Sequence, residues 1–347
     1  MRRKTRNNKR NHFCVRGRDG LLEVLPYRSW ISRPYIEVES TPNPSRWETV
    51  LDVEWRTLNL KTRQSSETLS TMPPGALFYG TAVACGSRIY VLGGRCSGDA
   101  RCPDKMFNDF HTHNSVFYFD SSRAGGVWSE GPPMLARRGS PSAFATGQKI
   151  YVFGSYHYNE GPFAEVFNIE LNRWDELPPP PAASDLDPHS VSEPVLFDSS
   201  RSRMLVHFRS NRSLHAFRPD DGSWECLDPE IGDWSHVSVI VDDVAYFLFS
   251  LGAGWFAEST KCFRAYNLVE KKWFPVNWSS EPPIAFGVSL PELFHLGNGV
   301  MCFTFYAQCF HFEKFRVEFK SGEYHAKAEP EFIITVPSDD GGQISVL

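Results

Sequence analysis

The sequence predicts an all-β fold built from repeated units, and three observations lead to this prediction. The first is a phrase in which an aromatic residue, six further residues and Trp follow one another: FNIELNRW (167–174), FRPDDGSW (217–224) and YNLVEKKW (266–273). The second is a β-rich run that precedes each phrase. The third is composition, because 14% aromatic residues suit pleated, half-buried surfaces, while 25 Pro and 25 Gly leave little room for long helices.

The phrase recurs with a nearly constant period. Trp174, Trp224 and Trp273 are spaced by 50 and 49 residues, and Trp128 lies 46 residues before Trp174. The partners expected for these four Trp residues are, in chain order, Tyr118, Phe167, Phe217 and Tyr266. We expect each partner to end a third strand and each Trp to begin a fourth, so that the two rings pack together against the adjoining unit. The phrase therefore predicts architecture rather than chemistry.

Short β-rich runs recur in phase with the phrase. They are SRIYVLGG (87–94), QKIYVFGS (148–155), SRMLVHFR (202–209), DVAYFLFS (243–250) and NGVMCFTF (298–305). A turn and a further short apolar strand precede each run. Four short antiparallel strands in about 50 residues cannot bury both faces alone, so we expect the units to stack radially as the blades of a β-propeller. Helical stretches between strands, which a parallel α/β sheet requires, are absent from the sequence pattern.

The repeat resembles a known family. Gly93 and Gly94 after a β-rich run, a later aromatic residue and the Trp beyond it resemble the kelch repeat, and the wording across 76–182 resembles plant F-box/kelch proteins. The resemblance covers about 76–330, and only the first unit keeps both glycines. It implies an all-β, kelch-type β-propeller. Readable repeats lie at about 76–136, 137–183, 190–232, 235–280 and 284–329, the fifth with Tyr324 where Trp is expected.

Six blades are expected in total, within a propeller that spans 31–347. Residues 31–60 and 331–347 read as further strands, and we expect them to form a closing blade that the two chain ends share. A five-blade or incomplete ring is the alternative. Eight of the first 18 residues are Lys or Arg. We expect 1–30 to be a flexible segment outside the ring: a nuclear signal, a weak nucleic-acid arm, a tail without function or an imperfect gene-model start.

Strand order predicts where a partner binds. Connections between second and third strands, and between successive blades, emerge on one face, and the long segments 95–114, 175–190 and 225–236 all fall there. Loops on a rigid scaffold commonly carry binding residues, and Arg and aromatic side chains are frequent interface anchors. The candidates for protein binding are Arg95, Arg101, Phe110, Arg137, Arg138, Tyr156, His157, Tyr158, Arg209 and Trp255.

One loop contains residues that are able to bind a metal. Cys96, Cys102, His111 and His113 have zinc-ligand chemistry, but their spacing matches no standard zinc motif. Asp109 and His113 resemble the iron motif of nitrile-specifier kelch proteins, although Lys105 stands where that motif has an acidic residue. A metal-dependent enzyme or specifier of nitrile-specifier or galactose-oxidase type is thus the alternative hypothesis. Our first hypothesis assigns no catalytic residue, metal or cofactor.

The resemblance implies a non-catalytic protein-interaction module. Related proteins often carry an F-box ahead of the propeller and deliver substrates to a cullin-type ubiquitin ligase. Residues 1–75 contain no F-box of the LPxDLxxxILxRLP kind, and GLLEVLPYRSW is a poor match that is too short. We therefore expect protein partners on the long-loop face, and the ligase adaptor only if a cryptic F-box exists.

Charge and composition restrict partners and compartment. The net charge of −5 gives no argument for nucleic acid or an anionic membrane, and no apolar run of 18 residues predicts a membrane span. No secretory signal is visible, so the eight cysteines are expected to be reduced, in the cytoplasm or the nucleus.

Overall fold

A computed structural model gives the fold of the chain. It describes residues 14–18, 21–25, 27–30, 56–59, 64–68, 80–96, 111–120, 126–139, 141–154, 161–180, 190–192, 194–235, 237–251, 260–279, 292–297, 299–307, 309–328, 332–334 and 343–346. Strands and turns dominate these residues, and they contain no α-helix. A helix of sufficient length and hydropathy to span a membrane is likewise absent from this part of the chain.

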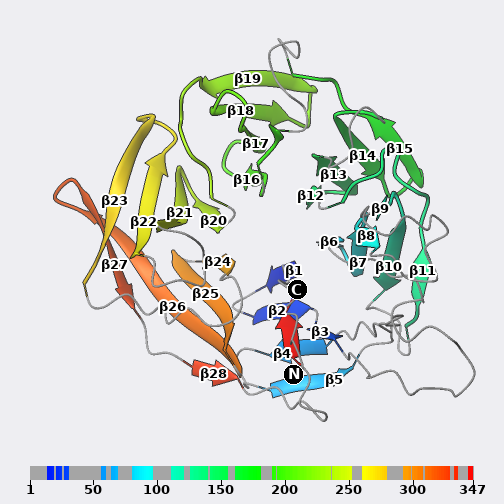
Figure 1. Cartoon of the computed structure of the whole chain (residues 1–347), viewed down its shortest axis with the longest axis horizontal. Coiled ribbons are helices and arrows are strands. Elements are labelled where there is room, and N and C mark those ends of the chain that lie inside the picture. The colour runs from blue at the N-terminus through cyan, green and yellow to red at the C-terminus, as the bar shows by residue number, and fades with distance from the viewer. Residues whose placement is uncertain are drawn as a thin grey trace, which may run out of the picture.

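Five blades follow one another as antiparallel four-stranded meanders (Figure 1). Blade 1 contains β6 (Thr81–Cys85), β7 (Arg88–Leu92), β10 (Val116–Asp120) and β11 (Trp128–Glu130). Blade 2 contains β12 (Ser142–Thr146), β13 (Lys149–Phe153), β14 (Ala164–Asn168) and β15 (Arg173–Glu176). Blade 3 contains β16 (Leu196–Asp198), β17 (Arg203–Phe208), β18 (Ser213–Arg218) and β19 (Ser223–Asp228).

The last two of these blades are continuous with each other. Blade 4 contains β20 (Ser238–Val241), β21 (Val244–Leu251), β22 (Thr260–Asn267) and β23 (Lys272–Trp278). Blade 5 contains β24 (Glu292–Gly297), β25 (Val300–Ala307), β26 (Cys309–Lys320) and β27 (Glu323–Ala328). Their outer strands, β23 and β27, pair in parallel through Val276–Tyr324, Asn277–His325 and Trp278–Ala326, so the two blades form one large sheet. The sequence pattern did not predict this pairing.

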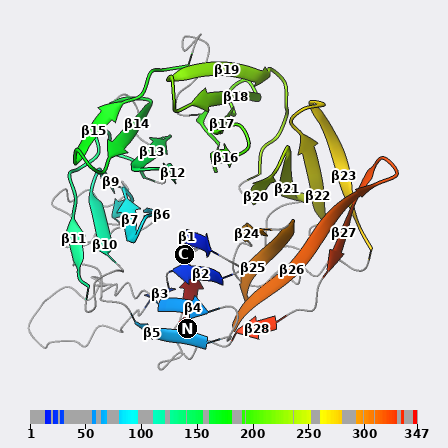
Figure 2. The same cartoon turned by 180° about the vertical axis from the view of Figure 1, so that it is seen from behind.

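A sixth sheet closes the ring, and its composition corrects our prediction. It contains β1 (Cys14–Arg18), β2 (Leu21–Leu25), β4 (Arg56–Asn59) and β5 (Gln64–Thr68), all from the N-terminal part of the chain. The innermost strand β1 contacts β6 of blade 1 and β24 of blade 5. Figures 1 and 2 show β1 nearest the axis and β5 at the rim. The closing blade therefore begins within 1–30, which we had placed outside the propeller.

The C-terminal strands lie beside this blade rather than within it. Strand β29 (Gln343–Val346) pairs with β3 (Tyr27–Trp30) in a separate two-stranded sheet, and β28 (Phe332–Ile334) pairs with β26 of blade 5. The two chain ends do meet, as predicted, but through β3 and β29. Strand propensity identifies these segments as strands, but it does not show which of several neighbouring strands each one pairs with.

The hydrophobic core is divided among the junctions between neighbouring blades. The core between blades 2 and 3, for example, joins Tyr151 and Phe153 to Met204, Val206 and Phe217. Similar clusters join blades 1 and 2, blades 3 and 4, and blades 4 and 5. Strand β17 is buried along its whole length, since it has a neighbouring blade on each side. This pattern confirms a kelch-type all-β propeller.

The repeated phrase forms the cross-strand aromatic pairs that were predicted. The ring centroids lie 5.0 Å apart for Phe167–Trp174, 5.0 Å for Phe217–Trp224 and 5.1 Å for Tyr266–Trp273. In each pair the two residues face each other in register across the third and fourth strands. The aromatic residue and the Trp thus form a wedge in each of these three blades.

The assignment of Tyr118 was wrong by one residue. Trp128 faces Phe119 across β10 and β11, with centroids 5.5 Å apart, whereas Tyr118 lies opposite Ser129. A shift of one residue places a side chain on the opposite face of a strand. The longer connection in blade 1 hid the register, because it differs in length from the turns of the other phrases. In blade 5, Tyr324 takes the Trp position and packs on Phe319 at 4.7 Å.

Candidate interaction face

The strand order gives the propeller two unlike faces. One carries the connections between second and third strands and between blades, and we call it the loop face. The other carries the hairpins between first and second and between third and fourth strands, and we call it the hairpin face. Left-handed residues allow tight hairpins there. Gly86, Gly147, Ser202, Asp242 and Gly299 occupy such positions in the first hairpins, and Asn172, Gly222, Lys271 and Gly322 in the second.

The structure describes some of the residues predicted to bind a partner. Arg137 and Arg209 are exposed and belong to loop-face connections. Arg95 lies in β8 (Arg95–Cys96), which pairs with β9 (His111–Thr112). The remaining candidates apart from Arg138 lie outside the described residues: Arg101, Phe110, Tyr156, His157, Tyr158 and Trp255.

Arg138 is a structural residue and not an exposed contact, which corrects its assignment. Its side chain is fully buried, and its Nε lies 2.7 Å from Glu165 Oε1, whose side chain is also fully buried. Burial lowers the pKa of Arg138, and the charge and hydrogen bond of Glu165 oppose this effect. The guanidinium also donates to the carbonyl of Pro162 at 2.9 Å and to that of Gly154. Arg138 therefore attaches the connection between blades 1 and 2 to the loop-face edge of blade 2, where β13 ends and β14 begins.

Gly93 permits the close packing of this same connection. It has φ of 59°, and an added Cβ would lie 2.4 Å from the carbonyl oxygen of Arg138. The next residue, Gly94, donates its N–H to that oxygen at 2.8 Å. The glycine pair of the first repeat thus serves backbone packing between blades 1 and 2.

A second group of polar residues lies on the loop face between blades 3 and 4. It combines the turn 209–212, which joins β17 to β18, with the inter-blade segment 229–235. His207, at the end of β17, connects the two. Its Nε2 lies 2.9 Å from the carbonyl oxygen of Gly232, and its Nδ1 lies 2.8 Å from Ser192 Oγ. A carbonyl only accepts, so Nε2 carries the proton and Nδ1 accepts from the Ser192 hydroxyl.

His207 is neutral in this environment. His207 is 2% exposed. Burial lowers its pKa from 6.5 to about 4, although the hydrogen bond to the Gly232 carbonyl acts in the opposite direction. The charges of Arg209, Asp233 and Arg212 also act on it, which places all three around the same ring. Trp234 stacks on the imidazole, with centroids 5.2 Å apart and planes 7° from parallel. The Trp234 indole N–H donates to the carbonyl of Pro194 at 3.1 Å.

Two exposed arginines, Arg209 and Arg212, belong to the same group as His207 and Trp234. Arg212 forms an ion pair with Asp233, and their side chains are 59% and 75% exposed. Arg209 is exposed and donates to the carbonyl of Val191 at 3.3 Å. Of these residues, the sequence pattern identified only Arg209. Arg212, Asp233 and Trp234 come from two segments that only the propeller geometry brings together.

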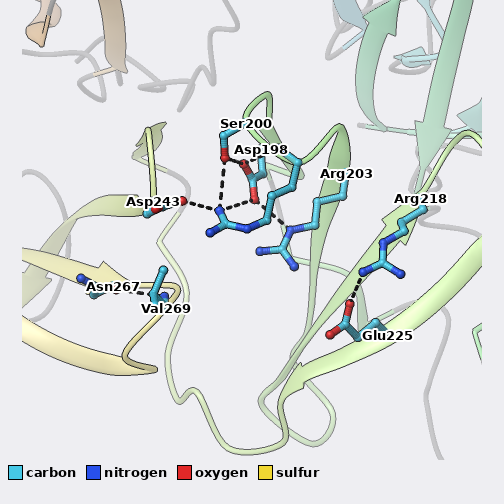
Figure 3. A network of polar contacts seen from close by, with 9 residues as sticks. Asp198, Ser200, Arg203, Arg218, Glu225, Asp243, Asn267 and Val269 are labelled. Atoms are coloured by element: carbon cyan, nitrogen blue, oxygen red, sulfur yellow. Dashed lines mark hydrogen bonds and ion pairs between the residues drawn. The ribbon is translucent and has the colours of Figure 1, made fainter.

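The hairpin face has a polar network of a different kind, shown in Figure 3. The fully buried carboxylate of Asp198 accepts from Arg203 Nε at 2.8 Å and from Ser200 Oγ at 2.6 Å. Burial raises the pKa of Asp198, but the hydrogen bonds and the positive charges of Arg203 and Arg201 lower it further, so the net shift is downward. Arg201 also pairs with Asp243 and so links blade 3 to blade 4. This network stabilises the scaffold.

The residues considered as metal ligands are described in part. Cys96 and His111 lie opposite each other across β8 and β9, and the backbone of His113 forms an isolated antiparallel β-bridge with that of Arg138. Cys102, Lys105 and Asp109 lie outside the described residues. Within the part of the chain that the structure covers, no three potential ligands gather at one point. Cys85, Cys226, Cys262 and Cys302 are free thiols, and Cys226 among them is exposed.

Comparisons with known proteins support the kelch resemblance. Three F-box/kelch-repeat proteins of Arabidopsis thaliana, one of them named putative, are 26%, 25% and 27% identical to the chain over 168, 207 and 234 residues. These matches cover 48%, 55% and 64% of the chain and 36%, 47% and 51% of the relatives. The chain thus spans about half or less of the length of these curated relatives. No protein-family model matches it.

Proposed function

We propose that this kelch-type propeller, similar to plant F-box/kelch-repeat proteins, is a non-catalytic module that binds another protein through its loop face. The observation that carries the proposal is the contrast between the two faces. Most connections on the hairpin face are short turns, whereas the longest connections of the described blades lie on the loop face, together with short turns such as 209–212. Binding residues concentrate on such loops because their variation leaves the scaffold intact.

The relatives' names suggest the biological setting. An F-box/kelch-repeat protein combines a propeller with a second module, and our proposal gives this propeller the corresponding role of substrate recognition in a ubiquitin ligase. The matches cover 36%, 47% and 51% of the relatives, so the role of the whole protein stays within the proposal. Direct binding of a ligase adaptor is expected only where an F-box accompanies the propeller.

The test is an affinity purification of the tagged chain from its native tissue, with mass spectrometry of the co-purifying proteins. Wild type is compared with Arg137→Glu and Arg209→Glu, two separate variants on the loop face, and with Arg173→Glu on the hairpin face. Arg173 is a suitable control because its side chain is 64% exposed and that of its ion-pair partner Asp175 is 45% exposed. Each of the three variants changes the charge equally.

The proposal expects one set of proteins that wild type and Arg173→Glu retain and that at least one of the two loop-face variants loses. Recovery of a cullin and its adaptor in that experiment supports the ligase role, whereas other partners without them support a free-standing interaction module. The opposite pattern, in which only Arg173→Glu loses partners, contradicts the assignment of the loop face. Absence of any protein enriched over the tag alone contradicts the interaction module itself.

A further inference from the structure

We propose that Arg209 and Arg212, with Trp234 beside them, bind a side-chain carboxylate of the protein partner. This inference rests on the proposed function and names one point on the loop face together with the chemistry that it recognises. We call the group formed by Arg209, Arg212, Asp233 and Trp234 the arginine turn site. The partner segment is expected to present Asp or Glu next to an apolar residue.

The turn that carries the two arginines is held in place before any partner binds. At its start, the N–H of Arg209 donates to the carbonyl of Ser190 at 2.7 Å, and the hydroxyls of Ser190 and Ser210 lie 2.9 Å apart. At its end, the Ser213 hydroxyl donates to Asn211 Oδ1 at 2.7 Å. A binding site that is already ordered loses less conformational entropy when the complex forms.

The arginine turn site also has a fixed base. His207 connects Ser192 to Gly232, and Trp234 stacks on His207 while it donates to Pro194. These contacts join the segment 229–235 to blade 3, so Asp233 and Trp234 keep their positions relative to the turn. Trp234 packs on His207 and on Phe247, with ring centroids 5.2 Å and 4.7 Å away, and stays part-exposed. Arg and Trp are the residue types most often found as interface anchors.

Hydrogen-bond donors are available at this site. The guanidinium of Arg209 makes one hydrogen bond within the described part of the chain, the 3.3 Å contact with Val191, and its group has five N–H donors. Arg212 shares its charge with Asp233, an ion pair that is open to solvent on both sides. A guanidinium binds a carboxylate through two parallel hydrogen bonds, which gives both strength and orientation.

The local charge favours a carboxylate over a phosphate. Within the arginine turn site, two arginines and one aspartate leave one net positive charge, and His207 adds none because it is neutral. A carboxylate neutralises that charge. A phosphorylated side chain carries about −1.5 to −2 near neutral pH, which leaves an excess of negative charge beside Asp233. The chain as a whole has a net charge of −5 and so repels acidic segments in general. The positive charge of the arginine turn site provides the local attraction that an acidic partner segment needs.

The experiment uses the full chain and a random peptide library displayed on phage. Selected peptides are synthesised in three forms: as selected, with each Asp or Glu changed to Asn or Gln, and with phosphoserine in its place. Their dissociation constants are measured for wild type and for the double variant Arg209→Gln with Arg212→Asn. Asn is chosen at Arg212 because φ there is 58°, a conformation that Asn tolerates better than most residues.

A matched control removes two charges from the other face. It combines Arg173→Gln with Lys271→Asn, and Lys271 is an exposed basic residue with φ of 53° in a hairpin turn. Circular dichroism and thermal unfolding are used to check that both double variants are folded. The inference expects selected peptides that share an acidic position, and affinity that falls at least about tenfold in the arginine double variant and with the amide peptides, but not in the control.

Several results would overturn the inference. These are selection of no peptides, selection of peptides without a shared acidic position, undiminished affinity in the arginine double variant, and phosphoserine peptides that bind tenfold tighter. The tissue purification separates this failure from failure of the proposed function. If Arg137→Glu abolishes partner binding while the arginine double variant retains it, the loop face binds the partner at another point and only the arginine turn site is wrong.

Discussion

Trp174 of blade 2 donates its indole N–H to the main-chain carbonyl of Pro132, at the end of blade 1, with a distance of 2.9 Å. The same contact recurs around the ring. Trp224 donates to Pro178 at 2.9 Å, and Trp273 donates to Ile231 at 2.7 Å. Each acceptor follows the Trp of the preceding blade by a few residues. The repeated Trp therefore joins a ring contact within its own blade to a hydrogen bond with the blade before it.

This contact predicts unequal effects of two equivalent substitutions. Trp174→Phe removes the donor from a residue that is 6% exposed, and we expect the free energy of unfolding to fall by about 1–3 kcal/mol. Trp224→Phe is expected to cost less, because Trp224 is only part-buried and water is able to replace the lost donor. Urea unfolding followed by circular dichroism measures both. Equal losses would show that the buried hydrogen bond contributes nothing specific.

Gly93 and Gly147 form a matched pair for a test of backbone packing. Both have φ of 59°, but an added Cβ meets Arg138 O at 2.4 Å from Gly93 and no atom within 4 Å from Gly147. We expect Gly147→Ala to cost about 1 kcal/mol from the left-handed conformation alone. Gly93→Ala is expected to cost clearly more, because the strand end must also move away from Arg138. Thermal unfolding of the two variants measures the difference.

His207 predicts a specific dependence of stability on pH. Its folded pKa of about 4 lies below the ordinary value of 6.5, so the unfolded chain binds the proton more readily. Its contribution to stability is present in full above pH 6.5 and is lost as pH falls from 6.5 to about 4. With 1.36 kcal/mol for each pKa unit, the loss amounts to at most roughly 3 kcal/mol.

The His207 effect is measured as the urea midpoint of wild type and of His207→Gln at pH 7 and pH 5. The variant is expected to lose stability at pH 7, and to change less than wild type between the two pH values. Ser192→Ala keeps the titrating ring and serves as the control, with the pH dependence retained. An identical pH dependence in wild type and His207→Gln would assign the effect to other groups.

The two arginines that contact Asp198 are expected to differ in their effect on stability. The Arg203 side chain is 7% exposed, and Arg203→Ala leaves a fully buried carboxylate with fewer partners, which is expected to cost about 3 kcal/mol. The Arg201 side chain is 37% exposed, and Arg201→Ala is expected to cost less than about 1 kcal/mol. Added salt should reduce the second cost more than the first. Chemical denaturation at two salt concentrations tests the contrast.

The sequence predicted what repeats and what is local. The phrase around Trp174, Trp224 and Trp273, the β-rich runs and the hairpins follow from patterns within single units. The errors concern long-range pairing. The alternation in YFDSS gave no means to choose Phe119 over Tyr118 as the partner of Trp128, because the connection there is longer. Nothing in the neighbouring residues Arg137 and Arg138 indicates that the first is exposed and the second is buried against Glu165.

The interaction face was predicted as a region and not as a set of contacts. Arg209 was identified by its position at the end of a β-rich run, but Asp233 and Trp234 come from the next inter-blade segment. Their proximity to Arg212 depends on how blade 3 packs against blade 4. The same reason explains the closing blade, whose strands β1, β2, β4 and β5 are set by ring closure rather than by any repeat.

The parallel pairing of β23 with β27 has a consequence for the order of unfolding. Blades joined through side chains and single hydrogen bonds are able to separate one at a time, as neighbouring units of a repeat protein do. Blades 4 and 5 share backbone hydrogen bonds as well, and the N–H of Ser279 extends them by donating to Ala326 O at 3.0 Å. We therefore expect these two blades to open as one cooperative unit, with amides in 276–279 and 324–326 exchanging hydrogen for deuterium at a common rate.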